Sequence, residues 1–448
     1  MILKENNTIN DLLIIGNGFD LQCKLKTRYK NFFEEKYGID FKTEELMELF
    51  PEKTYIQQRK NARDFFVQVF REAIYAYDSE KLTQSDSKSY GSLINHFKKF
   101  FRKNFSDFDP CLTNWDIIFI SSYILMSNGN NFQWVDIEKM IFKVVTVVIN
   151  NDKEVFSSLE FSNEQDRRQF INIVQYCFKD NKDTPTSMLD NLKKFEKSFA
   201  SYIKETITNS QSTYFKNAEK LLKYLTSSHN GESVHLDVIN FNYSLDENII
   251  NQMIKEECFS NISFNSWTNI HGVYSWNDSY TRSQINKLHD KITKLSPPIF
   301  GIDLHDISAT TNSVNFNDPR IIFTKPFRLI DNQINNMRDK KHQFQKKVNN
   351  IIFFGHSLGH ADYSYFESLF DIYNIYSSNV KLIFYYEKGN TNFQDRLSSQ
   401  KTLEKIIKLL TSYGQTLPNQ HGENIVNKLL LEQRLSLLQG PSSNESPL

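Results

Sequence analysis

The stretch DLLIIGNGFDL, residues 11–21, determines the fold class of this chain. Its apolar run LLII ends at Gly16 and Gly18, and Asp20 follows two residues later. A short apolar run that stops at glycines is typical of a buried strand entering a tight turn. Parallel α/β sheets begin in this way and bind nucleotides beyond the carboxyl ends of their strands. The stretch therefore predicts a nucleotide-binding α/β domain. Only GxG of the GxGxxG fingerprint is present, however, and a purely structural turn fits equally well.

Composition and charge narrow the classes of function. The 448 residues are enough for about two or three compact units. Basic and acidic side chains number 53 each, so no net field attracts nucleic acid or an anionic membrane. The cysteines, at positions 23, 111, 177 and 258, form no CxxC pair, which fits a reducing compartment and argues against a thiolate metal site. No basic leader and no run near the roughly 18 apolar residues of a membrane span is present. We therefore predict a cytoplasmic protein without metal, nucleic-acid or membrane partners.

Differences in residue composition and in the spacing of apolar residues divide the chain into three parts. Residues 43–230 are poor in Gly and Pro and repeat apolar residues at spacings of three and four, which predicts a large helical insertion. Strand-like runs return after it, so residues 1–42 and 231–390 are predicted to form one discontinuous, Rossmann-like domain around a parallel sheet. Leu and Ile repeats in residues 391–448 predict a helical C-terminal segment.

Polar side chains follow two predicted strands in the middle of the chain. Asn242 comes after the run LDVINF, and His271 comes after the run ending at Ile270. Parallel strands bring their carboxyl ends to one edge, so both side chains are expected in one cleft. A histidine titrates near neutrality and accepts a proton from water or a sugar hydroxyl, and a carboxamide orients water through its donor and its acceptor. A histidine satisfied within the fold is the competing interpretation for His271 alone.

Two acidic residues stand out in the insertion. Asp136 and Glu138 follow Trp134 at the start of an apolar, helix-patterned segment. Acids in a first turn complement the helix dipole, which explains Asp136 without any function. The alternative is that both acids line the cleft.

The segment GHSLG, residues 355–359, spells the GxSxG pattern of the α/β-hydrolase nucleophile elbow. In that alternative Ser357 is the nucleophile, and Glu387 and His421 complete the triad in the required chain order. No glycine-rich oxyanion loop precedes it, which disfavours the hydrolase. Lys325 and Arg328 follow another apolar run and either contact phosphates or form a solvated basic pair, and the solvated pair is the simpler prediction.

Five motifs in order resemble the AbiH family of bacterial phage abortive-infection proteins. They are IIGNGFDL near the amino terminus, WVDIE in the insertion, INFNYS and IHG in the middle, and FGHSLGHADYSYF near the end. The resemblance covers residues 11 to about 370. It implies a protein that arrests the infected cell in response to a phage-derived trigger.

A more distant similarity connects the same motifs with the sirtuin-like NAD-binding domains of antiphage NAD-cleaving proteins. It implies a sirtuin-like fold that takes NAD or a related nucleotide as substrate or ligand, with Asn242 and His271 as catalytic residues. The nucleotide-binding residues it implies are Gly16, Asn17, Gly18, Phe19, Asp20, Gly355, Ser357 and Asp362. The chain has GNGFD in place of a GAGxS-like turn and lacks the zinc-binding cysteine quartet of sirtuins, so NAD cleavage is favoured over protein deacylation.

Two classes of function follow from these resemblances. One is an NAD glycohydrolase, in which His271 polarises a ribose hydroxyl or the water and Asn242 directs the water at the anomeric carbon. The other is a non-catalytic nucleotide-binding sensor or scaffold. The pair of polar side chains exceeds what binding requires and favours the enzyme. Because a toxic activity is held off in uninfected cells, we expect control by homo-oligomerisation or by a lid, with Asp136 and Glu138 as the candidate lid residues.

Overall fold

A computed structural model describes ten segments of the chain and divides it into two compact units. The described residues are 8–36, 112–126, 134–178, 184–226, 232–256, 258–276, 297–311, 317–331, 344–418 and 422–441. The sheet unit comprises Met1–Thr27, Phe199–Val314 and Thr324–Leu448. The helical unit comprises Arg28–Ser198 and Asn315–Phe323. Each unit is discontinuous in sequence.

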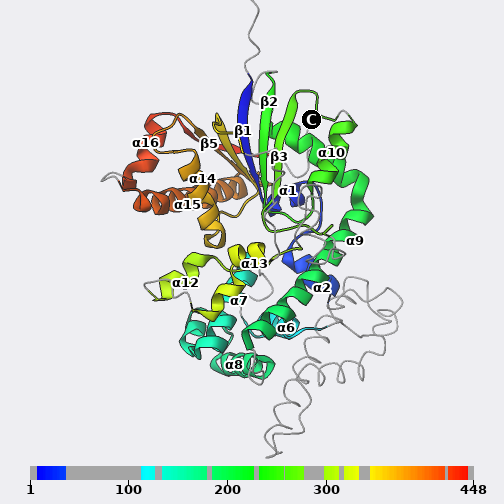
Figure 1. Cartoon of the computed structure of the whole chain (residues 1–448), viewed down its shortest axis with the longest axis vertical. Coiled ribbons are helices and arrows are strands. Elements are labelled where there is room, and N and C mark those ends of the chain that lie inside the picture. The colour runs from blue at the N-terminus through cyan, green and yellow to red at the C-terminus, as the bar shows by residue number, and fades with distance from the viewer. Residues whose placement is uncertain are drawn as a thin grey trace, which may run out of the picture. The chain divides into compact units, whose positions relative to one another are not determined.

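The sheet unit is built on six parallel strands in the order β3-β2-β1-β4-β5-β6 (Figure 1). The strands are β1 (Ile9–Ile15), β2 (Val234–Asn240), β3 (Ile262–Asn269), β4 (Asn350–Phe354), β5 (Lys381–Tyr386) and β6 (Leu435–Gln439). This is the strand order of doubly wound dinucleotide-binding domains, in which strands are added on one side of the first strand up to the third and on its other side from the fourth. The prediction of a Rossmann-like α/β fold is confirmed.

Helices cover both faces of this sheet. Three of them, α14 (Tyr363–Ile372), α15 (Asn392–Thr416) and α16 (Ile425–Leu431), pack against Leu12, Ile14 and neighbouring strand residues in one apolar core. They are orange to red in Figure 1, and α1 (Asn17–Gln22) and α10 (Glu247–Lys255) lie on the other side of the strands. The four residues of β1 from Leu12 to Ile15 are fully buried, which explains why both faces of β1 are apolar.

The C-terminal segment is helical, as predicted, except at its end. After α16 the chain turns at Gln433, whose φ is 55°, and then pairs with β5 as strand β6. Arg434 fixes this turn by donating hydrogen bonds from Nη1 to the carbonyls of Ile375 and Val380. The helical spacing of apolar residues continues through LSLL, residues 435–438. These residues nevertheless form a strand, because they pair with the open edge of β5.

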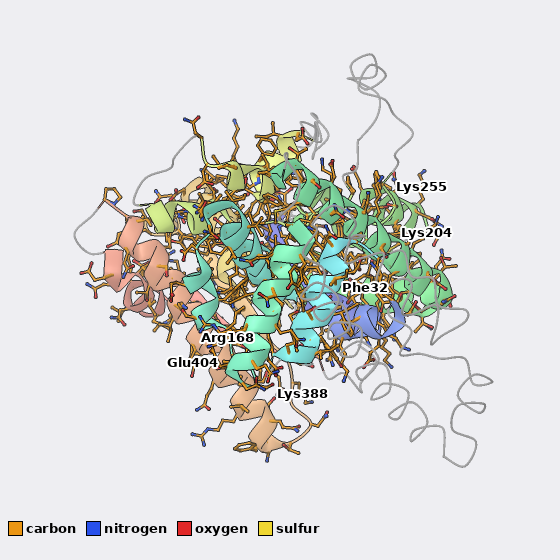
Figure 2. All side chains as sticks on the ribbon, turned by 90° about the horizontal axis from the view of Figure 1, so that it is seen from below. Phe32, Arg168, Lys204, Lys255, Lys388 and Glu404 are labelled. Atoms are coloured by element: carbon orange, nitrogen blue, oxygen red, sulfur yellow. The ribbon has the colours of Figure 1, made fainter. Side chains whose placement is uncertain are left out.

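The helical unit contains the described part of the predicted insertion up to Ser198. Its elements are α2 (Tyr29–Lys36), α6 (Asn114–Leu125), α7 (Trp134–Asn150), η2 (Lys153–Ser158), α8 (Glu164–Phe178), η4 (Pro319–Phe323) and the first part of α9 (Thr184–Thr226). Aromatic side chains fill its interior: the ring of Phe32, labelled in Figure 2, lies 5.6 Å from that of Phe195. Thr113 and Asp116 form a capping box that starts α6.

The unit boundaries differ from the predicted 43 and 230 at two helices. Helix α2 belongs to the helical unit, and α9 contributes to both units, because the sheet unit begins again at Phe199. Among the helices in the described segments, none is both long enough and apolar enough to cross a membrane.

Candidate functional site

Polar residues follow the carboxyl ends of the strands on both sides of the point, between β1 and β4, where the strand order reverses. Gly16 follows β1, Asn242 follows β2, His271 follows β3, and Gly355 follows β4. Register confirms that these ends are level, because Ile15 pairs with both Asn240 and Phe354. We call this set of strand ends the carboxyl edge.

The two glycine turns pack directly on each other. Gly16 donates its amide to the carbonyl of Phe354 at 3.0 Å, and Gly18 donates to that of Gly355 at 2.8 Å. A Cβ on Gly16 would lie 2.5 Å from the Cα of His356, and one on Gly18 would lie 2.6 Å from the Cα of Gly355. Glycine is therefore required here for backbone packing. The amides of Gly16 and Gly18 donate to these carbonyls and are therefore not available to bind a phosphate.

Helix α1 follows the first turn and places Asp20 in the interior. Asp20 Oδ1 accepts hydrogen bonds from the hydroxyls of Tyr214 at 2.6 Å and Ser244 at 2.7 Å. Burial raises the pKa of Asp20 to about 6, against the lowering effect of these two donors. In the same stretch the Phe19 ring is fully buried beside Phe354, and Asn17 Oδ1 accepts a hydrogen bond from Thr27.

Asn242 joins the ends of β1, β2 and β3. Its Nδ2 donates to the carbonyl of Gly16 at 2.9 Å, and its own amide donates to Asn240 Oδ1 at 2.8 Å. Its carbonyl accepts a hydrogen bond from Asn269 at 3.2 Å. The carboxamide is thereby held in one orientation at the carboxyl edge.

An ionic cluster centred on Asp362 stands beside these residues. His271 Nε2 lies 3.3 Å from Asp362 Oδ1, and Lys325 Nζ donates to the same oxygen at 2.7 Å. His356 Nε2 lies 3.2 Å from Oδ2. We call Asp362, His271, His356 and Lys325 the Asp362 cluster. Three separate elements thus converge on one carboxylate: the ends of β3 and β4, and helix α13 (Lys325–Asp331).

The two histidines of the cluster differ in how firmly they are held. His356 Nδ1 accepts a hydrogen bond from the amide of Leu358 at 2.9 Å, so its proton is assigned to Nε2, which faces Asp362. His271 Nε2 is buried and close to Asp362, but the two atoms are not aligned as a hydrogen bond. His356 is therefore locked, whereas His271 retains unused hydrogen-bonding capacity.

Charge and burial set the protonation states of the cluster. Burial and then the Lys325 ammonium lower the pKa of His271 to about 4, against the opposing effect of Asp362. Burial by itself would raise the pKa of Asp362, but Lys325 and then His271 hold it well below its usual range. At neutral pH the site consequently holds a carboxylate, an ammonium ion and an uncharged His271.

Aromatic rings fix the positions of both imidazoles. Phe241, the last residue before Asn242, meets the His271 ring edge to face at 5.2 Å and the His356 ring at 4.4 Å. The Tyr365 ring centroid lies 5.8 Å from that of His271. Rotation of His271 is restricted by these contacts.

Ser357 lacks the surroundings of a nucleophile. It is exposed, and within the described segments its hydroxyl accepts only a 3.3 Å hydrogen bond from Gly359 N–H. The strained backbone of a nucleophile elbow is not at Ser357, since the positive φ angles in this turn belong to Gly355 and Leu358. Glu387 is exposed after β5, and His421 lies outside the described residues.

The two acids of the insertion lie in the helical unit. Asp136 is half-buried in the first turn of α7, and Glu138 is buried on the same helix. They remain predicted lid residues. Asp362 and His271, by contrast, belong with Asn242 to the sheet unit, where the structure brings them to the carboxyl edge.

Two cluster members were missed from sequence. The prediction of a solvated Lys325 and Arg328 pair is wrong, because both side chains are buried, at 1% and 2% exposure. His356 lies inside the GHSLG motif, but the motif predicts a role only for Ser357. In the described part of the chain no group of three or more acidic, histidine or cysteine side chains is arranged to hold a metal ion.

Comparison with known proteins gives one result. The family model described as "Bacteriophage abortive infection AbiH" matches residues 12–386. The match covers both glycine turns, Asn242, His271 and the whole Asp362 cluster. No curated protein and no solved structure matches the chain.

Proposed function

The chain belongs to the AbiH family of bacteriophage abortive-infection proteins, and on that premise we propose that it arrests infected cells by cleaving the glycosidic bond of NAD or a related nucleotide. A phage-derived trigger and self-association would control the activity, because an unregulated enzyme of this kind would kill its host. The sirtuin-like relationship belongs to the same proposal.

The main support is the position of His271 relative to the fold. Doubly wound sheets of this strand order bind dinucleotides where the strand order reverses, between the first and fourth strands and beyond their carboxyl ends. His271, Asn242 and Asp362 all lie at this edge, although they come from segments far apart in the sequence. A buried histidine beside a carboxylate is a candidate reactive group.

His271 has the protonation state that the chemistry needs. Its Nε2 faces Asp362, which assigns the proton to that nitrogen and leaves Nδ1 as an acceptor. In the proposed reaction the bond between the ribose anomeric carbon and nicotinamide breaks, and a water oxygen bonds to that carbon. Nicotinamide leaves as a neutral molecule, and the proton released by the water passes to Nδ1 and then to solvent.

Asn242 suits the task of orienting that water. Its Nδ2 is committed to the Gly16 carbonyl, which fixes the plane of the carboxamide and leaves Oδ1 to accept a hydrogen bond. A water held in this way approaches the oxocarbenium-like carbon in one direction.

A nucleotide-binding sensor without catalytic activity is the second candidate. The observation that favours it is the use of Asn242 as a link between β1, β2 and β3, which is a structural task. In that case the Asp362 cluster only shapes the site, and a partner performs the toxic step.

Incubation of purified protein with NAD, with and without phage lysate, tests the enzyme. We expect nicotinamide release by the wild type and a loss of at least about 100-fold in His271→Ala, since positioned acid-base groups contribute about 10²–10⁴-fold. Thermal unfolding of both proteins with and without NAD is the control for folding and binding. Protection by NAD without any nicotinamide release would instead support the sensor.

Replacement of Ser357 distinguishes the glycohydrolase from the serine hydrolase. At saturating NAD, Ser357→Ala is expected to retain the rate of nicotinamide release within about threefold, because Ser357 is a nucleotide contact in this proposal and its exposed hydroxyl is hydrogen-bonded to Gly359 and to no histidine in the described segments. The assay is repeated with a panel of short-chain esters. Ester hydrolysis by the wild type that disappears in Ser357→Ala would contradict the glycohydrolase.

A further inference from the structure

We propose that Lys325 is a positioning residue of this site, its ammonium group fixing the Asp362 carboxylate against the imidazoles of His271 and His356. The catalytic meaning of this role rests on the proposed function. The ionic arrangement itself does not depend on the substrate.

The backbone of Lys325 is placed by a loop, residues 297–303, that is hydrogen-bonded to His271. Ile299 donates its amide to the His271 carbonyl at 2.9 Å, so this loop lies against the end of β3. Ile302 forms a parallel bridge with Thr324, and Lys325 donates its own amide to the Ile302 carbonyl at 3.1 Å. The loop thus connects the backbone at Lys325 to the backbone at His271.

The same loop is attached to the helix that carries the carboxylate. The Ser364 hydroxyl donates to Asp303 Oδ1 at 2.6 Å, which ties the loop to the start of α14. Asp362 immediately precedes that helix, and Lys325 Nζ donates both to Asp362 Oδ1 and, at 3.2 Å, to the Ala361 carbonyl. The backbones that carry the ammonium and the carboxylate are therefore both hydrogen-bonded to the same loop, unlike those of an ordinary surface ion pair.

Electrostatics explains why the ammonium is needed. Lys325 is 1% exposed and Asp362 is 8% exposed, and a buried charge is tolerated only when it is paired. Within the described segments the groups that face His271 are Asp362, Lys325, His356, Phe241 and Tyr365, and Lys325 is the cation among these. If it were removed, the Asp362 carboxylate would draw a proton onto a neighbouring imidazole. His271 would then be an imidazolium, with no nitrogen left to accept a proton.

The test follows the titration of His271 by NMR in protein labelled with ¹³C at its histidines. The signal is assigned with His271→Asn. In the wild type His271 is expected to stay uncharged from about pH 5 to 8, because its pKa is about 4. In Lys325→Met the pKa is expected to rise to about 6 or above, a change in proton affinity of about 100-fold or more. The acid limb of nicotinamide release should move upward in pH by the same amount.

Three variants make the result specific. Lys325→Arg keeps the charge and should leave His271 uncharged in this range. Lys325→Gln keeps a donor toward Asp362 without the charge, and it replaces Lys325→Met if that variant does not fold. Lys381→Met removes an exposed lysine from β5 and should leave the His271 titration unchanged.

The outcomes separate this role from the proposed function. A folded Lys325→Met or Lys325→Gln protein in which His271 still stays uncharged down to pH 5 would overturn the role of Lys325, whatever happens to its thermal stability. A shifted His271 titration in Lys325→Met, together with a wild-type protein that releases no nicotinamide with or without phage lysate, would support the positioning role and refute the glycohydrolase.

Discussion

Gly355→Ala is expected to destabilise the sheet unit by about 2–5 kcal/mol. Gly355 has a φ of 68°, and a Cβ at this position would lie 2.4 Å from the Phe19 amide nitrogen and 2.7 Å from the Gly18 backbone. The left-handed backbone costs an alanine about 1–2 kcal/mol. Forcing an extra atom between two backbones costs about 1–3 kcal/mol or more. The total of about 2–5 kcal/mol is a large part of the 5–15 kcal/mol that stabilises a typical domain.

Urea unfolding of Gly355→Ala measures this loss, with Gly440→Ala as the matched control. The Cβ of Gly440 would lie 3.0 Å from the carbonyl oxygen of Tyr386, a contact that a small shift relieves, so we expect a loss below about 1 kcal/mol there. The pair of variants also decides what the glycine turns are for. If Gly355→Ala keeps wild-type stability but loses protection by NAD, the glycine serves the ligand and the packing explanation is wrong.

The carboxyl edge could be predicted because its signals are local. Asn242 and His271 each follow an apolar run, and in a parallel sheet all such runs end at one edge. Nothing more than strand recognition was needed to place them together. The glycines were recognised in the same way, but the sequence pattern is identical whether a turn approaches a phosphate or, as Gly16 and Gly18 do, another backbone.

The Asp362 cluster could not be predicted in full because its partners are set by tertiary structure. Lys325 comes shortly after the apolar run IIF, residues 321–323. This run has the residue pattern of a strand, but it lies in the 3₁₀ helix η4. The lysine turns inward to meet Asp362, which lies 37 residues later in the chain. Strand β6 was missed for a related reason. Its residues continue a helical pattern, and only the unpaired edge of β5 favours a strand.

Asp20→Asn is expected to stabilise the folded protein at neutral pH by about 3 kcal/mol. The pKa of Asp20 rises from 3.8 to about 6 on folding, and each pH unit of such a difference corresponds to about 1.4 kcal/mol. Because the folded state holds the proton more tightly, the stability linked to this proton is complete below about pH 4 and is lost as the pH rises through about 6. Asparagine carries no charge, so it should escape this loss while its Oδ1 still accepts from Tyr214 and Ser244.

Chemical unfolding of wild type and Asp20→Asn at several pH values between 4 and 8 measures the effect. The two proteins should be about equally stable near pH 4 and separate as the pH rises through 6. Asp20→Ala is the control, because it leaves the hydroxyls of Tyr214 and Ser244 without their acceptor and should be less stable than Asp20→Asn at every pH. An advantage of Asp20→Asn that does not change with pH would show that the carboxylate is not the source.

If Asp20→Asn is the more stable protein, the aspartate beside the glycine turn has a reason other than stability. An ionised Asp20 weakens the fold at neutral pH, whereas an asparagine would satisfy the same two hydroxyls without that cost. Destabilising groups of this kind concentrate at functional sites, where activity opposes stability. A stabilised Asp20→Asn protein that also loses nicotinamide release would therefore place the charge of Asp20 within the function. A stabilised variant with full activity would reduce Asp20 to a structural contact between α1 and α9.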